Sequence, residues 1–264
     1  MITFARKSKY LSQITVILIL FFSVLTVGGL TFTFQHIALK YKHYITAFGV
    51  AFVLSLICLH LLPEVFESNV NQVGIYLLLG FVFQLILELF SRGIEHGHVH
   101  DSQHNHSVNR TLLAMFFGLS LHSFIEGIPL FILDGEAVHK GHEHLAMQPD
   151  LGFSNVFLWA IVGHKIPVSI VLMLFLLQAE LKKRQVLLLI LLFSLMSPLG
   201  AVAGILLHSA NWLGEVSTIL LAITTGMLMH ITTLLVFEEY HHQQDKLKNI
   251  LLIVAGIGLG VLIF

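Results

Sequence analysis

The chain has little charge for its length. Only 11% of its 264 residues are Asp, Glu, Lys or Arg, against about 25% in soluble globular domains, and 56% are hydrophobic. Its mean hydropathy is +0.87. A soluble fold is therefore excluded, and the composition predicts a polytopic membrane protein with very little soluble domain.

Cysteine is nearly absent as well. Cys58 is the only one, so no intrachain disulfide can form and a cysteine-rich metal cage is excluded. Without a second thiolate the chain is also a poor match for Cu⁺, which prefers sulfur ligands. The net charge of −1 argues against a nucleic-acid partner, and no Walker loop is present to bind ATP.

Long apolar runs account for most of the chain. A membrane-crossing helix needs about 20 apolar residues. Eight segments meet or approach that length, the third and the eighth being short: 12–34, 43–66, 73–91, 109–134, 154–178, 185–208, 212–238 and 247–264. The first run is too long for the apolar region of a signal peptide. We therefore expect an all-α bundle of eight transmembrane helices forming a single domain, residues 1–264.

The basic residues predict the orientation, because Lys and Arg concentrate in cytoplasmic loops. The connections after the first, third, fifth and seventh segments carry nine: Lys40, Lys42, Arg92, Arg110, Lys182, Lys183, Arg184, Lys246 and Lys248. The other side carries four, Arg6, Lys7, Lys9 and Lys140. This places both termini outside and the segment 91–110 in the cytoplasm, although the basic N-terminus runs against the rule.

Several ionisable residues lie within the apolar segments: His60, His122, Glu126, His164, Lys165 and His230. Each costs roughly 2.5–3.5 kcal/mol to insert, so such residues usually serve a function. His122 and Glu126 are four apart and share one helix face. An imidazole and a carboxylate, joined by His164 from another helix, suit a divalent metal. For His230 and His208 the simpler interpretation is a hydrogen bond between helices.

Nitrogen and oxygen ligands together favour Zn²⁺, and the same set accommodates Fe²⁺, Mn²⁺, Co²⁺ or Cd²⁺. Four of the five prolines fall within the spans, at positions 63, 129, 167 and 198. Each removes a backbone N–H and should loosen its helix locally. Such breaks are tolerated in membranes where they line a cavity, as in transporters.

These motifs resemble the ZIP (Zrt/Irt-like) family of divalent-metal transporters. The pattern H-S-x-x-E-G stands at 122–127, H-K at 164–165, H-L-L-P-E at 60–64, and T-G-M-L-M-H at 225–230. The resemblance implies that His122, Glu126 and His164 bind the transported ion, with His60 as a fourth ligand. It is closest to a branch of zinc-uptake members carrying the H-S and H-K pair.

Many members of that family hold a second metal beside the first. At the corresponding positions this chain has Ser123, Lys165, Val168 and Ser197, none of which supplies a carboxylate. Lys165 would place an ammonium group roughly where the second cation sits. The resemblance with these departures predicts a site for a single ion. The alternative for Lys165 is a lysine that extends to the membrane surface.

The segment after the third span carries five histidines in eleven residues: His96, His98, His100, His104 and His106. We hypothesise a labile site that receives or senses metal on the cytoplasmic side; the alternative is a solvated polar loop. His139, His142 and His144, in the predicted outer loop between the fourth and fifth spans, could gather metal before transport.

The sequence thus predicts uptake of a divalent cation, most simply Zn²⁺, into the cytoplasm by alternating access, across the plasma (cell inner) membrane. The metal would be a substrate, with no catalytic cofactor and no enzyme activity. A membrane zinc hydrolase with Glu126 as general base, a haem or di-iron protein, and a structural protein with hydrogen-bonded histidines are the rival hypotheses. Whether the chain works as a homodimer is left open.

Overall fold

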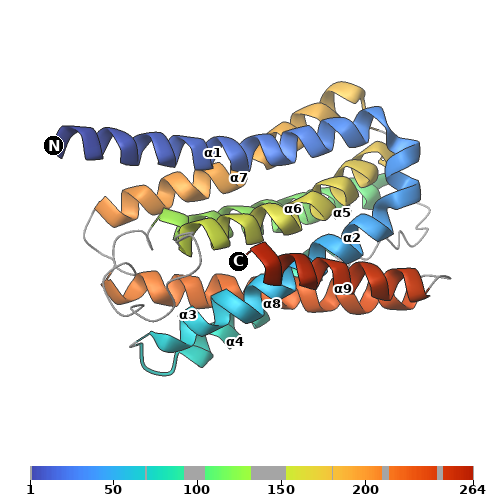
Figure 1. Cartoon of the computed structure of the whole chain (residues 1–264). Coiled ribbons are helices and arrows are strands. Elements are labelled where there is room, and N and C mark those ends of the chain that lie inside the picture. The colour runs from blue at the N-terminus through green and yellow to red at the C-terminus, as the bar shows by residue number, and fades with distance from the viewer. Residues whose placement is uncertain are drawn as a thin grey trace.

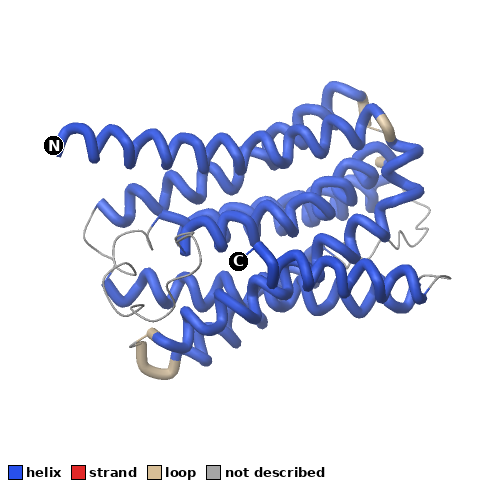
Figure 2. The backbone as a smooth tube through the Cα atoms, viewed as in Figure 1, coloured by secondary structure: helices blue, strands red, loops and turns tan. Residues whose placement is uncertain are grey.

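A computed structural model describes residues 2–68, 70–91, 105–131, 153–179, 181–209, 214–242 and 246–263. These residues are almost entirely helical and include no strand, which confirms the all-α prediction (Figure 2). The elements are α1 (Ile2–Thr33), α2 (Gln35–Leu56), η1 (Ile57–Leu61), α3 (Leu62–Glu67), α4 (Val73–Ser91), α5 (Asn105–Gly127), η3 (Ile128–Phe131), α6 (Phe153–Gln178), α7 (Lys183–Ser209), α8 (Gly214–His242) and α9 (Lys246–Ile263).

Six stretches of the described chain are long and apolar enough to cross a membrane: Gln13–Thr33, Gln35–Glu67, Leu112–Phe131, Val156–Gln178, Lys183–Leu207 and Val216–Val236. Two shorter apolar helices, Val73–Leu89 and Leu247–Ile263, are the third and eighth segments that the sequence already marked as short. The protein is therefore an integral membrane protein whose helices lie where the hydropathy of the sequence placed them.

The helices form an elongated bundle of roughly parallel and antiparallel rods (Figure 1). On one side, α1 packs against α6 and α7, and α5 packs against α7. On the other side, α4 packs against α8, and α2 packs against α9 and α8. Contacts of α2 with α6 and of α4 with α5 join these two groups of helices. The three candidate ligands that the structure brings together, His122, Glu126 and His164, all lie on helices of the first group.

The prolines differ in their effect on the helices. Pro63 follows a five-residue π-helical turn, η1, and Pro129 lies in the 3₁₀ turn η3, so both interrupt regular α-helix as expected. A π turn relieves the clash between a proline ring and the carbonyl four residues earlier, and such turns are frequent at functional sites. Pro167 and Pro198 differ, because α6 and α7 continue through them as α-helix.

Close contact between α5 and α7 depends on glycine. A Cβ atom on Gly200 would overlap the carbonyl oxygen of Phe124, and one on Gly204 would overlap the carbonyl oxygen of Ile128. On α5, a Cβ on Gly127 would overlap the carbonyl oxygen of Ser197. Small residues at this spacing let two transmembrane backbones touch. The approach brings Ser197 of α7 beside Glu126 of α5.

Along α5, α6 and α7, the intramembrane residues 122–126, 164–165 and 197 lie at one level, here called the polar layer, with an apolar cluster on each side of it. Leu130 of η3, Ile161 of α6 and Ala201 of α7 belong to one cluster. The other cluster lies on the opposite side of the layer and includes Leu119 of α5, Leu172 of α6 and Phe193 of α7. Between them, on the same three helices, lie the intramembrane residues 122–126, 164–165 and 197. The polar layer is therefore flanked on both sides by buried apolar side chains.

Candidate metal site in the polar layer

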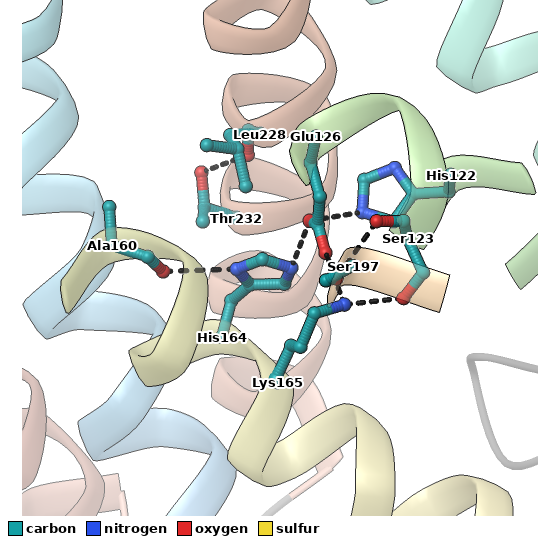
Figure 3. A network of polar contacts seen from close by, with 9 residues as sticks. All are labelled: His122, Ser123, Glu126, Ala160, His164, Lys165, Ser197, Leu228 and Thr232. Carbon is teal, nitrogen blue, oxygen red and sulfur yellow. Dashed lines mark hydrogen bonds and ion pairs between the residues drawn. The ribbon is translucent and has the colours of Figure 1, made fainter. Parts of the chain in front are cut away.

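Glu126 is the centre of the polar layer (Figure 3). Its carboxylate atom Oε2 lies 3.2 Å from Nε2 of His122, one turn earlier on α5, and 2.9 Å from Nε2 of His164 on α6. The ligand atoms of the three residues all lie within 4.8 Å of one another, and each residue is buried. Among the described residues, no other group of three His, Cys, Asp or Glu side chains converges in this way.

The hydrogen bond made by Nδ1 of His164 determines which ring nitrogen is available to a metal. Nδ1 lies 3.0 Å from the carbonyl oxygen of Ala160, one turn earlier on α6. A carbonyl oxygen only accepts, so Nδ1 carries a proton, and Nε2, 2.9 Å from Oε2 of Glu126, is the ring nitrogen that can bind a metal when the imidazole is neutral. Fixing the tautomer from behind is how proteins commonly orient a metal-binding histidine.

The facing atoms lie close together without forming regular hydrogen bonds. Nε2 of His122 and Nε2 of His164 are within ion-pair distance of Oε2 of Glu126, but none of these three buried atoms makes a hydrogen bond of acceptable geometry. Buried polar atoms without regular hydrogen bonds are costly and call for an explanation such as an ion. Two imidazole nitrogens and a carboxylate oxygen this close together are a donor set that suits a divalent cation.

The second carboxylate oxygen has a different set of neighbours. Oε1 of Glu126 forms an ion pair with Nζ of Lys165, which also donates a hydrogen bond to Oγ of Ser123. Oγ of Ser197 lies 3.0 Å from the same Oε1 and 2.8 Å from the carbonyl oxygen of Ser123. One oxygen of Glu126 thus faces the imidazoles, and the other faces Lys165 and Ser197.

Lys165 does not extend to the membrane surface. Its side chain is 2% exposed, and Nζ lies 5.3 Å from the centre of the Phe193 ring. An ammonium group buried this deeply needs a counter-charge, and breaking such a pair is expensive. The ion pair with Glu126 provides that counter-charge, so the interpretation of Lys165 as an internal cation beside the site fits its surroundings.

The structure leaves two of the predicted residues outside this group. His60 lies in the π turn η1, half-buried, and is not part of the converging set. Val168 is partly buried and packs against the second apolar cluster. The histidines at 96, 98, 100 and 104, like those at 139, 142 and 144, lie outside the described residues; His106 falls in the first turn of α5, where its side chain is not described.

His230 makes the contact between helices that the sequence favoured for it. Its Nε2 lies 2.7 Å from Oε2 of Glu88 on α4, and its ring packs edge-on against Phe81, with centroids 4.6 Å apart. Glu88 was missed in the sequence analysis. The available signal was a carboxylate near the end of a short apolar segment, a position that needs a partner inside the bundle.

The fold is an all-α membrane bundle in which two histidines and a glutamate are buried between two apolar clusters. These features are typical of membrane proteins that bind a divalent cation within their helices. The profile of the ZIP zinc transporter family matches residues 95–264, and the chain belongs to that family. The matched region contains all three converging residues and begins after His60. A comparison with curated proteins gave no match.

The proteins of this family are transporters of divalent metal ions, and membership makes divalent-metal transport the activity of this protein. The metal is accordingly a substrate, and the buried group of two imidazoles and one carboxylate could hold such an ion. The resemblance seen in the motifs at 122–127 and 164–165 is confirmed at the level of the family.

Proposed function

We propose that the protein carries Zn²⁺ into the cytoplasm by alternating access, with His122, Glu126 and His164 as the ligands of the ion in transit. The observation that carries this proposal is the convergence of three buried ligand atoms within 4.8 Å of one another, none of which makes a regular hydrogen bond. An ion there would coordinate all three at once.

The ligand types favour zinc over harder ions. Two neutral imidazoles suit Zn²⁺, whereas Mg²⁺, Ca²⁺ and Mn²⁺ prefer oxygen. Three protein ligands leave a tetrahedral ion one position for water, the arrangement of exchangeable zinc sites rather than of closed structural ones. A transport site needs that exchangeability, because the ion must leave as readily as it binds.

Movement between the two groups of helices would provide alternating access. The three ligands lie on α5 and α6, in the group packed with α1 and α7, and so can move together. The ligands are buried between two apolar clusters, as expected of a conformation closed to both sides of the membrane. We propose that sliding of this group against α2, α4 and α8 opens a route through one apolar cluster at a time.

The same surroundings support a site for a single ion. Where a second cation would need carboxylates, the chain has the ammonium of Lys165, the hydroxyls of Ser123 and Ser197, and the aliphatic Val168. Lys165 already neutralises one side of Glu126. His60 remains our proposed fourth ligand, for a conformation in which η1 lies closer to the site than it does here.

Uptake into proteoliposomes tests the proposal. Purified protein should take up Zn²⁺ from a panel containing Zn²⁺, Fe²⁺, Mn²⁺ and Cd²⁺, and His122→Ala should abolish that uptake while His230→Ala retains it. A structural protein with hydrogen-bonded histidines would give no uptake at all, and a haem protein would show a Soret band. Equal uptake by wild type and His122→Ala would contradict the proposed site.

A further inference from the structure

The two oxygens of the Glu126 carboxylate are held unequally. Oε2 faces the Nε2 atoms of His122 and His164, the two groups that would bind the ion with it. Oε1 is engaged by two donors, the ammonium of Lys165 and the hydroxyl of Ser197. Hydrogen bonds to an ionised group are the strong ones, and here they lie in a medium that excludes water. The carboxylate therefore has one oxygen directed to the imidazoles and one oxygen restrained by Lys165 and Ser197.

Ser197 is well placed to enforce this restraint. It is 2% exposed, and its Oγ lies between Oε1 of Glu126 and the carbonyl oxygen of Ser123, at 3.0 and 2.8 Å. Both neighbours are acceptors, so the hydroxyl proton is held between them. The glycine-mediated contact of α5 with α7 keeps the serine at this distance, since a side chain at Gly200 would separate the helices.

From this asymmetry we infer that Ser197, together with Lys165, determines metal specificity by forcing Glu126 to bind the ion through Oε2 alone. The inference rests on the proposed function and adds to it the basis of selection. A carboxylate with one available oxygen gives three protein ligands in all, which suits a small tetrahedral ion. Larger, oxygen-preferring ions gain from a second carboxylate oxygen, and here that oxygen is already bonded.

The restraint on Oε1 should change the preference for Zn²⁺ over Mn²⁺ rather than the ability to transport Zn²⁺. Removing the hydroxyl of Ser197 frees one restraint on Oε1 and leaves the three ligands in place. Mn²⁺, which prefers oxygen and six ligands, should then compete better against Zn²⁺. Lys165→Met removes the stronger restraint and should move the ratio further in the same direction.

The experiment measures how much Mn²⁺ is needed to halve Zn²⁺ uptake in proteoliposomes, together with the binding affinity of each ion for the purified protein. Relative to wild type, Ser197→Ala should lower the required Mn²⁺ by roughly three- to tenfold, the effect of one typical intramolecular hydrogen bond. Ser194→Ala is the matched control: this serine lies one turn earlier on α7, is equally buried, and donates only to Leu191 of its own helix.

Each outcome is decisive. A shift in Ser197→Ala and a larger one in Lys165→Met, with no change in Ser194→Ala, supports the inference. An unchanged ratio in both variants, with Zn²⁺ binding retained, overturns it while leaving zinc transport intact. If Ser197→Thr, which keeps the hydroxyl, shifts the ratio as much as Ser197→Ala, the hydrogen bond is not the cause. Absence of Zn²⁺ uptake and binding in the wild type would instead overturn the proposed function itself.

Discussion

Glu126 is the residue on which the polar layer depends. It contacts both imidazoles through one oxygen and Lys165 and Ser197 through the other. Its charge compensates a buried ammonium in the absence of metal and supplies an anionic ligand in its presence. Stability and metal binding are therefore tied to the same side chain.

Replacing this carboxylate should affect both properties. In Glu126→Gln the ammonium of Lys165 stays buried without a counter-charge, which typically costs about 3–5 kcal/mol. We expect a lower thermal unfolding temperature in detergent and loss of bound Zn²⁺. Glu126→Gln combined with Lys165→Met should recover stability but not metal binding.

The control for this substitution is Glu67→Gln, since Glu67 is exposed at the end of α3. It should leave the unfolding temperature and the Zn²⁺ affinity near those of the wild type. Unaltered stability in Glu126→Gln would show that the ion pair with Lys165 is not formed in the membrane protein.

At the residue scale, the sequence predicted the candidate ligands but not the residues that contact them. The four-residue spacing put His122 and Glu126 on one face, because helix geometry is local. The pairing of His230 with Glu88 and the hydroxyl of Ser197 beside Glu126 join residues 142 and 71 positions apart. No spacing rule encodes such contacts, since they depend on how helices pack.

Among the elements, the pair of α5 and α7 is the one that sets the geometry of the site. Gly200 and Gly204 let the two backbones touch, and that contact sets the distance between Glu126 and Ser197. The hydropathy of the sequence located both helices but carried no information on which helices would be neighbours. Likewise it anticipated the breaks at Pro63 and Pro129 but not the uninterrupted α-helix through Pro167 and Pro198.

Widening this contact should weaken transport. In Gly200→Ala the new methyl group would overlap the carbonyl oxygen of Phe124, and because backbone cannot yield locally the helices must separate. Overpacking of this kind costs about 1–3 kcal/mol. We expect a lower unfolding temperature and slower Zn²⁺ uptake.

Gly29→Ala is a suitable comparison for that variant, because a Cβ at Gly29 on α1 meets nothing within 4 Å. Alanine also favours helix over glycine, so this variant should be as stable as the wild type or slightly more so. If the two substitutions gave the same stability and uptake rate, the close contact of α5 and α7 would have no bearing on transport.

For the whole molecule, direction of transport depends on orientation. The even number of expected spans puts both termini on one side, and the distribution of Lys and Arg places that side outside. The orientation is thus predicted from charge alone.

Cysteine labelling can test it, because Cys58 is the only cysteine. In a Cys58→Ser background, a cysteine at the exposed Asn71, between α3 and α4, should react with a membrane-impermeant maleimide on intact cells. A cysteine at the exposed Lys182, between α6 and α7, should react only after permeabilisation. The reverse pattern would invert the topology and with it the proposed direction.

The central claim is that one ion is held by two imidazoles and one carboxylate inside the bundle. Zinc X-ray absorption on purified protein lacking residues 96–106 tests it directly, since the deletion removes the histidine-rich segment as a competing site. The account predicts one Zn²⁺ per chain, with two histidine nitrogens at about 2.0–2.1 Å and oxygen at about 2.0–2.2 Å, lost in His164→Ala. Two zinc ions per chain, or an unchanged spectrum in His164→Ala, would contradict it.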